Sequence, residues 1–143
     1  MKRVIVHKVK RFPSWANAND GKTRAISDIK NREIWVKPNT SQASLYHERG
    51  HIVKHHSLGM NRLPSNYIND EVEATLYSYE KIGEPKHSLL RFKGWFNDLT
   101  NHYKLSPSRA ILMIRNRLMK PDIPDTWKED YKKLEREYRR VYR

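Results

Sequence analysis

The chain contains no cysteine among its 143 residues. Disulfide bonds and thiolate-bound metals are therefore excluded, so any metal site must be built from histidine, aspartate or glutamate. Long apolar runs are also missing: the N-terminal stretch MKRVIVHKVKRF has only short apolar segments between basic residues, which is unlike a signal peptide, and no later stretch approaches membrane-spanning length. We therefore expect a cytoplasmic protein with no membrane partner.

Acidic residues are scarce beside basic ones, with 16 Asp and Glu against 29 Lys and Arg, a formal net charge of +13. The excess lies at the two ends of the chain. Basic and acidic residues number 10 and 3 in residues 1–40, 7 and 7 in residues 41–100, and 12 and 6 in residues 101–143. Clustered positive charge attracts DNA or an acidic partner. A merely solvated basic surface has the same composition, so both interpretations stay open.

The first 40 residues carry the signature of β-structure. β-Branched residues predict strands at 3–9 and 32–38, and a weaker one at 23–29. Polar turn signals between consecutive candidates favour hairpin connections. We therefore expect a small, mostly antiparallel three-stranded sheet.

The rest of the chain has helical spacing. A first helix follows residue 40, where Thr40 or Ser41 can cap it, and others are predicted at about 69–82, 87–103 and 106–118. The fourth has Ser106 as its cap and a proline at its first position. A last amphipathic helix opens with a capping box, Thr126 to Glu129. The predicted class is α+β, with the sheet packed on the first helices and a helical C-terminal region.

Four of the seven histidines lie in one stretch, SLYHERGHIVKHH, residues 44–56. Its segment HERGH fits the pattern H-E-x-x-H. On an α-helix, His47 and His51 lie about 40° apart on successive turns, so both imidazoles can reach one ion. Glu48 lies about 60° from His51, displaced from ligation but able to reach a water on that ion. This is the arrangement that metal-assisted hydrolysis requires.

A third metal ligand must come from outside this stretch. A third histidine in the H-E-x-x-H-x-x-G-x-x-H pattern would fall at position 57, which is Ser, and position 54 is Lys instead of Gly. The later segment INDEVEATLYSYE offers Glu71 and Glu73. They lie about 200° apart around one helix, so only one of them can share the site.

The order of these segments resembles a known class of zinc peptidase. A strand REIWVKPN, then the H-E-x-x-H helix, then a helix with E-x-E-A is similar to the core of the gluzincins, in particular ImmA/IrrE-type peptidases and minigluzincins. Their third zinc ligand is a glutamate commonly followed by alanine. The resemblance therefore implies that His47, His51 and Glu73 bind Zn²⁺, with Glu71 as the alternative, and that Glu48 is the catalytic base.

The resemblance extends over about residues 23–118 and implies both a division and an activity. A minimal zincin catalytic domain would occupy residues 1–90, and a helical extension residues 91–143. The implied activity is that of a zinc metalloendopeptidase acting on a protein substrate, such as a regulator or repressor. A latent form, with the last helix covering the site, is a further implication. The usual leucine of the motif is replaced by Arg49.

A function of another class fits the helical pair at 97–118. Its spacing suits a helix-turn-helix, in which Arg109, Arg115 and Arg117 would contact DNA. The alternative is thus a basic DNA-binding regulatory protein whose zinc site is structural or vestigial.

Overall fold

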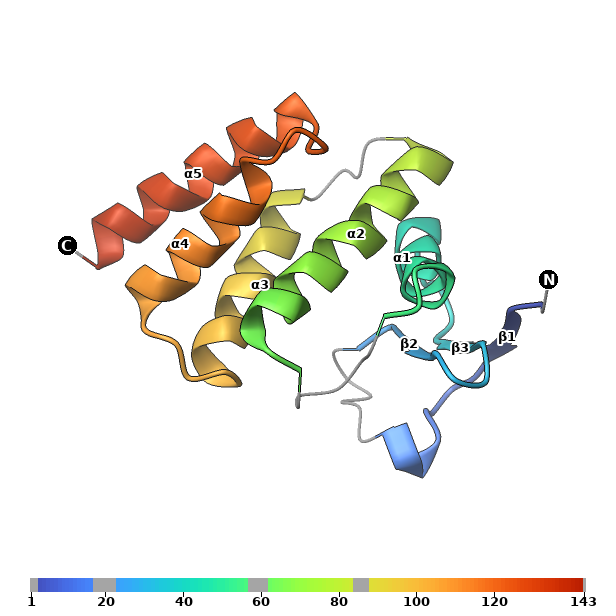
Figure 1. Ribbon diagram of the computed structural model, residues 1–143. Helices are drawn as coiled ribbons and strands as arrows, with labels where there is room; N and C mark the ends of the chain where they lie inside the picture. The colour runs from blue at the N-terminus through green and yellow to red at the C-terminus, as the bar shows by residue number, and fades with distance from the viewer. Residues whose placement is uncertain (1–2, 17–22, 57–61, 84–87, 143) are drawn as a thin grey trace. The chain divides into compact units, whose positions relative to one another are not determined.

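The computed structural model describes residues 3–16, 23–56, 62–83 and 88–142. Within these residues, three strands and five α-helices follow one another, with a short 3₁₀ helix after the first strand (Figure 1). They are β1 (Ile5–Lys8), the 3₁₀ helix (Ser14–Ala16), β2 (Ala25–Asp28), β3 (Glu33–Val36), α1 (Gln42–Val53), α2 (Pro64–Ile82), α3 (Ser88–Asn101), α4 (Pro107–Leu118) and α5 (Asp125–Val141). The predicted α+β class is confirmed. None of the described helices has the length and apolarity needed to cross a membrane.

The chain divides into two compact units. The sheet unit comprises residues 1–58 and 70–85, and so holds the three strands, α1 and most of α2. The helical unit comprises residues 59–69 and 86–143, and holds the start of α2 together with α3, α4 and α5. The helical unit takes α3 whole, whereas a division after residue 90 would cut that helix.

The sheet is mixed, not mostly antiparallel as expected. Its strand order is β1-β3-β2. β2 and β3 pair antiparallel, with Ala25 opposite Val36, as their short connection predicts. β1 instead pairs in parallel with the other edge of β3, with Ile5 opposite Glu33. Among the described strands, β2 is thus an edge strand, and its outer side is not paired with β1.

One face of the sheet packs on α1. Ile34 and Val36 of β3 and Ile52 of α1 form the buried centre of this contact. Half-buried Val6 and Leu45 extend it from β1 and α1. Successive side chains of a strand point to opposite faces, so every second side chain of β3 points toward the helix. Buried and half-buried positions therefore alternate along this strand. This packing holds α1, and the histidines it carries, against the sheet.

In the helical unit α3, α4 and α5 lie side by side (Figure 1). Ser106 Oγ accepts a hydrogen bond from the Arg109 N–H, so the predicted cap of α4 is confirmed. The capping box predicted for α5 is wrong, because the helix begins at Asp125 after Pro124 and has no side-chain cap. The core of the helical unit is mainly apolar and aromatic. Its fully or nearly fully buried side chains are Phe92, Trp95, Leu99, Ile114, Trp127, Tyr131 and Leu134.

Candidate metal centre

The histidines of the H-E-x-x-H segment lie on one side of α1. The helix starts where Ser41 Oγ accepts a hydrogen bond from the Ser44 N–H at 3.1 Å, so Ser41 is the cap. Regular helix from that point places His47 and His51 on successive turns, with ring centroids 4.8 Å apart. Both side chains are buried, His47 to 6% exposure and His51 to 2%. Two imidazoles thus face the interior from adjacent turns, as the motif predicts.

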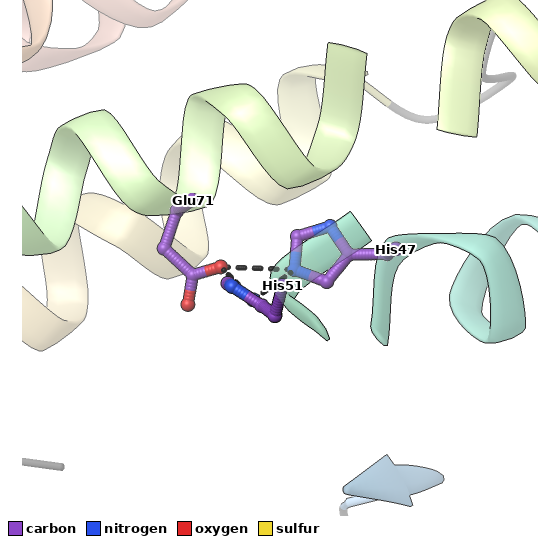
Figure 2. A group of neighbouring side chains, drawn as sticks. All are labelled: His47, His51 and Glu71. Atoms are coloured by element: carbon purple, nitrogen blue, oxygen red, sulfur yellow. Dashed lines mark hydrogen bonds and ion pairs between the residues drawn. The ribbon is translucent and has the colours of Figure 1, made fainter. Parts of the chain in front are cut away.

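Glu71, from α2, completes a group of three with these histidines (Figure 2). Its Oε2 lies 2.9 Å from His47 Nε2 and 3.1 Å from His51 Nε2. The two Nε2 atoms are themselves 3.1 Å apart. In the part of the chain that the structure describes, these side chains offer three donor atoms close enough together to hold one metal ion.

The preference for Glu73 as third ligand is corrected by this arrangement. Glu73 Oε2 lies 3.3 Å from His56 Nε2, and it is Glu71 that joins the two histidines. The reason is the rotation of α2 about its axis. Buried Thr75, one turn after Glu71, marks the side of α2 that meets α1, and Glu73 lies on another side. The buried small residues Thr75 and Ser78, at helical spacing from Glu71, were the sequence signal for this choice.

Close backbone contact fixes that rotation. A Cβ added to Gly50 of α1 would lie 3.0 Å from Ala74 Cα and 3.0 Å from Tyr77 Cβ, so only glycine fits without displacing α2. One turn further along α2, Ser78 Oγ donates to the Ala43 carbonyl oxygen at 3.0 Å. These two contacts lock the helices in register. The carboxylate of Glu71 is positioned as a consequence.

Each histidine is also held at the nitrogen that faces away from Glu71. His47 Nδ1 lies 3.0 Å from Thr75 Oγ1. His51 Nδ1 lies 2.9 Å from His56 Nδ1. His56 is buried, whereas its neighbour His55 is exposed. A contact at Nδ1 thus orients each ring, and histidines that bind a metal are usually held in this way at the nitrogen that does not bind it.

The electrostatics of the group favour a cation. Burial by itself raises the pKa of the Glu71 carboxyl, but hydrogen bonds and charge attraction from His47 and His51 outweigh it and hold that pKa well below its usual value. A carboxylate oxygen and two imidazole nitrogens within 3.1 Å of one another repel unless a proton or a metal ion lies among them.

Zinc suits this donor set. Two histidine nitrogens and one carboxylate oxygen are the ligands of a familiar class of catalytic zinc site. Ligand atoms around a tetrahedral Zn²⁺ with bonds of about 2.0–2.1 Å are separated by about 3.3 Å. The observed separations of 2.9, 3.1 and 3.1 Å are slightly shorter than this. The residues present therefore fit a tetrahedral ion with one position left open.

A hydrogen bond from a residue of the sheet orients the Glu48 side chain. Ser27 Oγ, on the edge strand β2, donates a hydrogen bond to Glu48 Oε2 at 2.7 Å. Glu48 follows His47 directly in α1, and it is partly exposed. A carboxylate that is oriented by a hydroxyl and open to water can accept a proton from a solvent molecule.

No family model, curated protein or solved structure matches the chain. The gluzincin resemblance therefore rests on the motifs alone and stays a prediction.

The three arginines proposed to contact DNA differ in their exposure. Arg117 is only 8% exposed, and its guanidinium donates to both carboxylate oxygens of Asp122, at 3.0 and 2.9 Å, and to Asn69 Oδ1 at 2.9 Å. Arg109 and Arg115 are exposed but line different cavities of the helical unit. Arg117 is thus engaged inside the unit; it lines one cavity together with Arg109, whereas Arg115 lines another.

Proposed function

We propose that the chain is a zinc-dependent metallopeptidase. The observation that carries the proposal is that His47 Nε2 and His51 Nε2, on the helix that also carries Glu48, lie within 3.1 Å of each other and of a Glu71 carboxylate oxygen from α2. These three side chains would hold Zn²⁺. Three protein ligands are typical of catalytic zinc, because the fourth position is then left for water.

The chemistry divides between the ion and the chain. Bound Zn²⁺ would lower the pKa of a water ligand to about 7 and polarise a carbonyl group. Glu48 would accept the proton of that water and later donate it to the leaving amine. Ser27 would orient the Glu48 carboxylate through its hydrogen bond to Oε2. Peptide-bond hydrolysis at neutral pH needs no further cofactor.

The edge strand β2 supports a peptide as substrate. The Lys37 N–H donates to the Arg24 carbonyl oxygen at 2.9 Å, which marks these residues as a hydrogen-bonded pair of the ladder. Because such pairs alternate along antiparallel strands, the backbone groups of Ala25 and Ser27 point away from β3. An extended peptide could pair with them. Since Ser27 also contacts Glu48, a strand bound there would run beside the proposed base.

The test combines metal analysis with a substitution that spares the ligands. Purified chain should contain one zinc per molecule and cleave members of a peptide library. Glu48→Gln should keep the zinc and the circular dichroism spectrum but lower the cleavage rate by about 10²- to 10⁴-fold, the usual contribution of a general base. Glu80→Gln, at an exposed position of α2, is the matched control and should cleave normally.

Two results would count against the proposal. One is a wild-type chain that binds no zinc, especially if it also retards DNA with a steep salt dependence, as the nucleic-acid alternative requires. The other is a zinc-loaded Glu48→Gln variant that cleaves as fast as wild type.

A further inference from the structure

His56 has no place in the proposed ligand set, yet it is only 6% exposed and lies against a ligand. The end of α1 explains how it arrives there. The His56 N–H donates to the His51 carbonyl oxygen, and the His55 N–H to the Ile52 carbonyl oxygen, which together form a Schellman motif. His55 takes the left-handed conformation that this motif requires, with φ 55°. The chain therefore turns back, and the His56 ring meets the His51 ring.

The hydrogen-bond donors and acceptors around the two histidines determine which ring nitrogen carries the proton. Thr75 Oγ1 donates its proton to the Glu71 carbonyl oxygen at 2.8 Å. Toward His47 Nδ1, 3.0 Å away, that hydroxyl can therefore only accept. His47 thus carries its proton on Nδ1 and presents a lone pair at Nε2, the atom that faces Glu71.

The position of the proton on His51 follows in the same way, from the contact of His51 with His56 and the contact of His56 with Glu73. The Glu73 carboxylate accepts only, so the proton of a neutral His56 lies on its Nε2, which is 3.3 Å from Glu73 Oε2. His56 Nδ1 then has a lone pair and accepts from His51 Nδ1, 2.9 Å away. His51 in turn presents a lone pair at Nε2. One assignment therefore satisfies the contacts at both Nδ1 atoms and leaves the two Nε2 lone pairs and the Glu71 carboxylate facing one another, ready to bind a metal.

We propose that His56, supported by Glu73, is a positioning residue for the metal centre. It fixes the tautomer and the ring orientation of His51 and raises the basicity of the ligating nitrogen. This inference rests on the proposed zinc site. It gives Glu73 a role as well: Glu73 lies behind the ligand shell and anchors the outer end of a Glu73–His56–His51 chain.

Three substitutions test the acceptor at His56 Nδ1. His56→Leu removes it and should weaken zinc binding about 10- to 100-fold, as loss of such partners usually does. His56→Asn places an amide oxygen close to the position of Nδ1 and should bind zinc within a few-fold of wild type. His56→Gln places its amide further out and should behave like His56→Leu. The neighbouring control is His55→Asn, because asparagine tolerates a positive φ, and it should bind zinc normally.

The measurement is competition with a chromophoric zinc chelator on the full chain, after circular dichroism has shown that each variant is folded. A second readout follows the proton itself. In zinc-loaded protein labelled with ¹⁵N at histidine, His51 should show a slowly exchanging Nδ1–H, and His56→Leu should shift it and speed its exchange.

The outcomes separate the inference from the proposed function. Wild-type chain that binds no zinc overturns both. Wild-type chain that binds zinc, with His56→Leu and His56→Gln equally tight, overturns the positioning role alone. So does a spectrum in which His51 binds zinc through Nδ1. If His56→Leu does not fold, the contrast between His56→Asn and His56→Gln decides the question.

Discussion

Within each of the two units, the helices bury a different kind of side chain where they pack against one another. In the sheet unit, the contact between α1 and α2 encloses His47, His51 and Glu71, all titratable. In the helical unit, the contact between α3 and α5 encloses apolar rings such as Phe92 and Trp127. Apolar groups need only a matching shape, whereas a carboxylate and two imidazoles need a cation. We therefore expect a bound metal ion to determine the stability of the contact between α1 and α2 in the sheet unit. In the helical unit, we expect the packing of side chains alone to determine the stability.

The strongest test of this contrast removes the charge from the metal centre. Glu71→Gln preserves the size of the side chain but removes the anionic ligand, so zinc affinity should fall by more than about 100-fold, the upper end of the effect of an outer partner. Glu73→Gln is the matched control two residues away. It keeps an acceptor for His56 and should lose about 10-fold at most. Chelator competition measures both. A larger loss in Glu73→Gln than in Glu71→Gln would reverse the ligand assignment.

The counterpart in the helical unit is Trp127, whose side chain is fully buried. Trp127→Ala leaves a large cavity and should lower the free energy of unfolding by about 3–5 kcal/mol. Zinc affinity should stay at the wild-type value while the protein is folded. Urea denaturation followed by fluorescence and circular dichroism measures the first quantity, and chelator titration the second. The exposed Trp15 is the control, and Trp15→Ala should cost about 1 kcal/mol or less.

Local signals predicted much of the fold and two members of the group that could hold a metal ion. A cap followed by proline set the start of α4 at Ser106 and Pro107, because both act within one turn. The spacing of His47 and His51 placed two imidazoles together, because three residues between them make one turn of helix. The same proline signal at Pro64 marks the true start of α2, five residues before the expected one.

Long-range contacts decided what the sequence left open. Glu71 and Glu73 are equal candidates by composition, and the choice depends on how far α2 is rotated against α1. The contact of Gly50 with Ala74 sets that rotation, and its local trace in the sequence is the helical spacing of Thr75 and Ser78 from Glu71. In the same way, β1 pairs in parallel with β3, a partner 28 positions further along the chain in register. Pairing over such a distance has no turn signal to announce it.

Two helical glycines sharpen the comparison, because one lies in each unit. Gly50→Ala should be destabilising by about 1–3 kcal/mol, since its Cβ would press on the backbone of Ala74 at 3.0 Å. Gly94→Ala, on an exposed side of α3 with no atom within 4 Å of the added Cβ, should stabilise by up to about 1 kcal/mol through helix propensity. Thermal and urea unfolding compare the two variants.

The site provides a further readout for this pair. Gly50→Ala should also weaken zinc binding, because it moves α1, with its histidines, away from Glu71. Gly94→Ala should leave the affinity unchanged. Equal effects of the two substitutions on stability would mean that α1 and α2 are not in backbone contact.

The smallest expected effect concerns the ion pair of the helical unit, which joins buried Arg117 to half-exposed Asp122. The hydrogen bond from Arg117, helped by its charge, holds the pKa of Asp122 below its usual value. A depressed carboxyl pKa contributes stability above the unfolded-state pKa of about 3.9, and this contribution is lost as the pH falls through the folded-state pKa. Because Asp122 is half-exposed, Asp122→Asn should cost about 1 kcal/mol or less at pH 7.

The pH dependence of the stability difference between wild type and Asp122→Asn should differ from the pH dependence of zinc binding. The first reports on the helical unit and the second on the sheet unit. Between pH 5 and 7 the wild-type chain should keep its full advantage over Asp122→Asn, and the two should converge below about pH 4 as the aspartate takes up its proton. Zinc binding should weaken as the pH falls, because the imidazoles of His47 and His51 must be unprotonated to bind the ion. Urea unfolding of metal-free protein at several pH values, beside chelator titrations over the same range, measures both. If Asp122→Asn shifted the pH at which zinc is released, the ion pair and the metal centre would be coupled, and the separation between the units would fail.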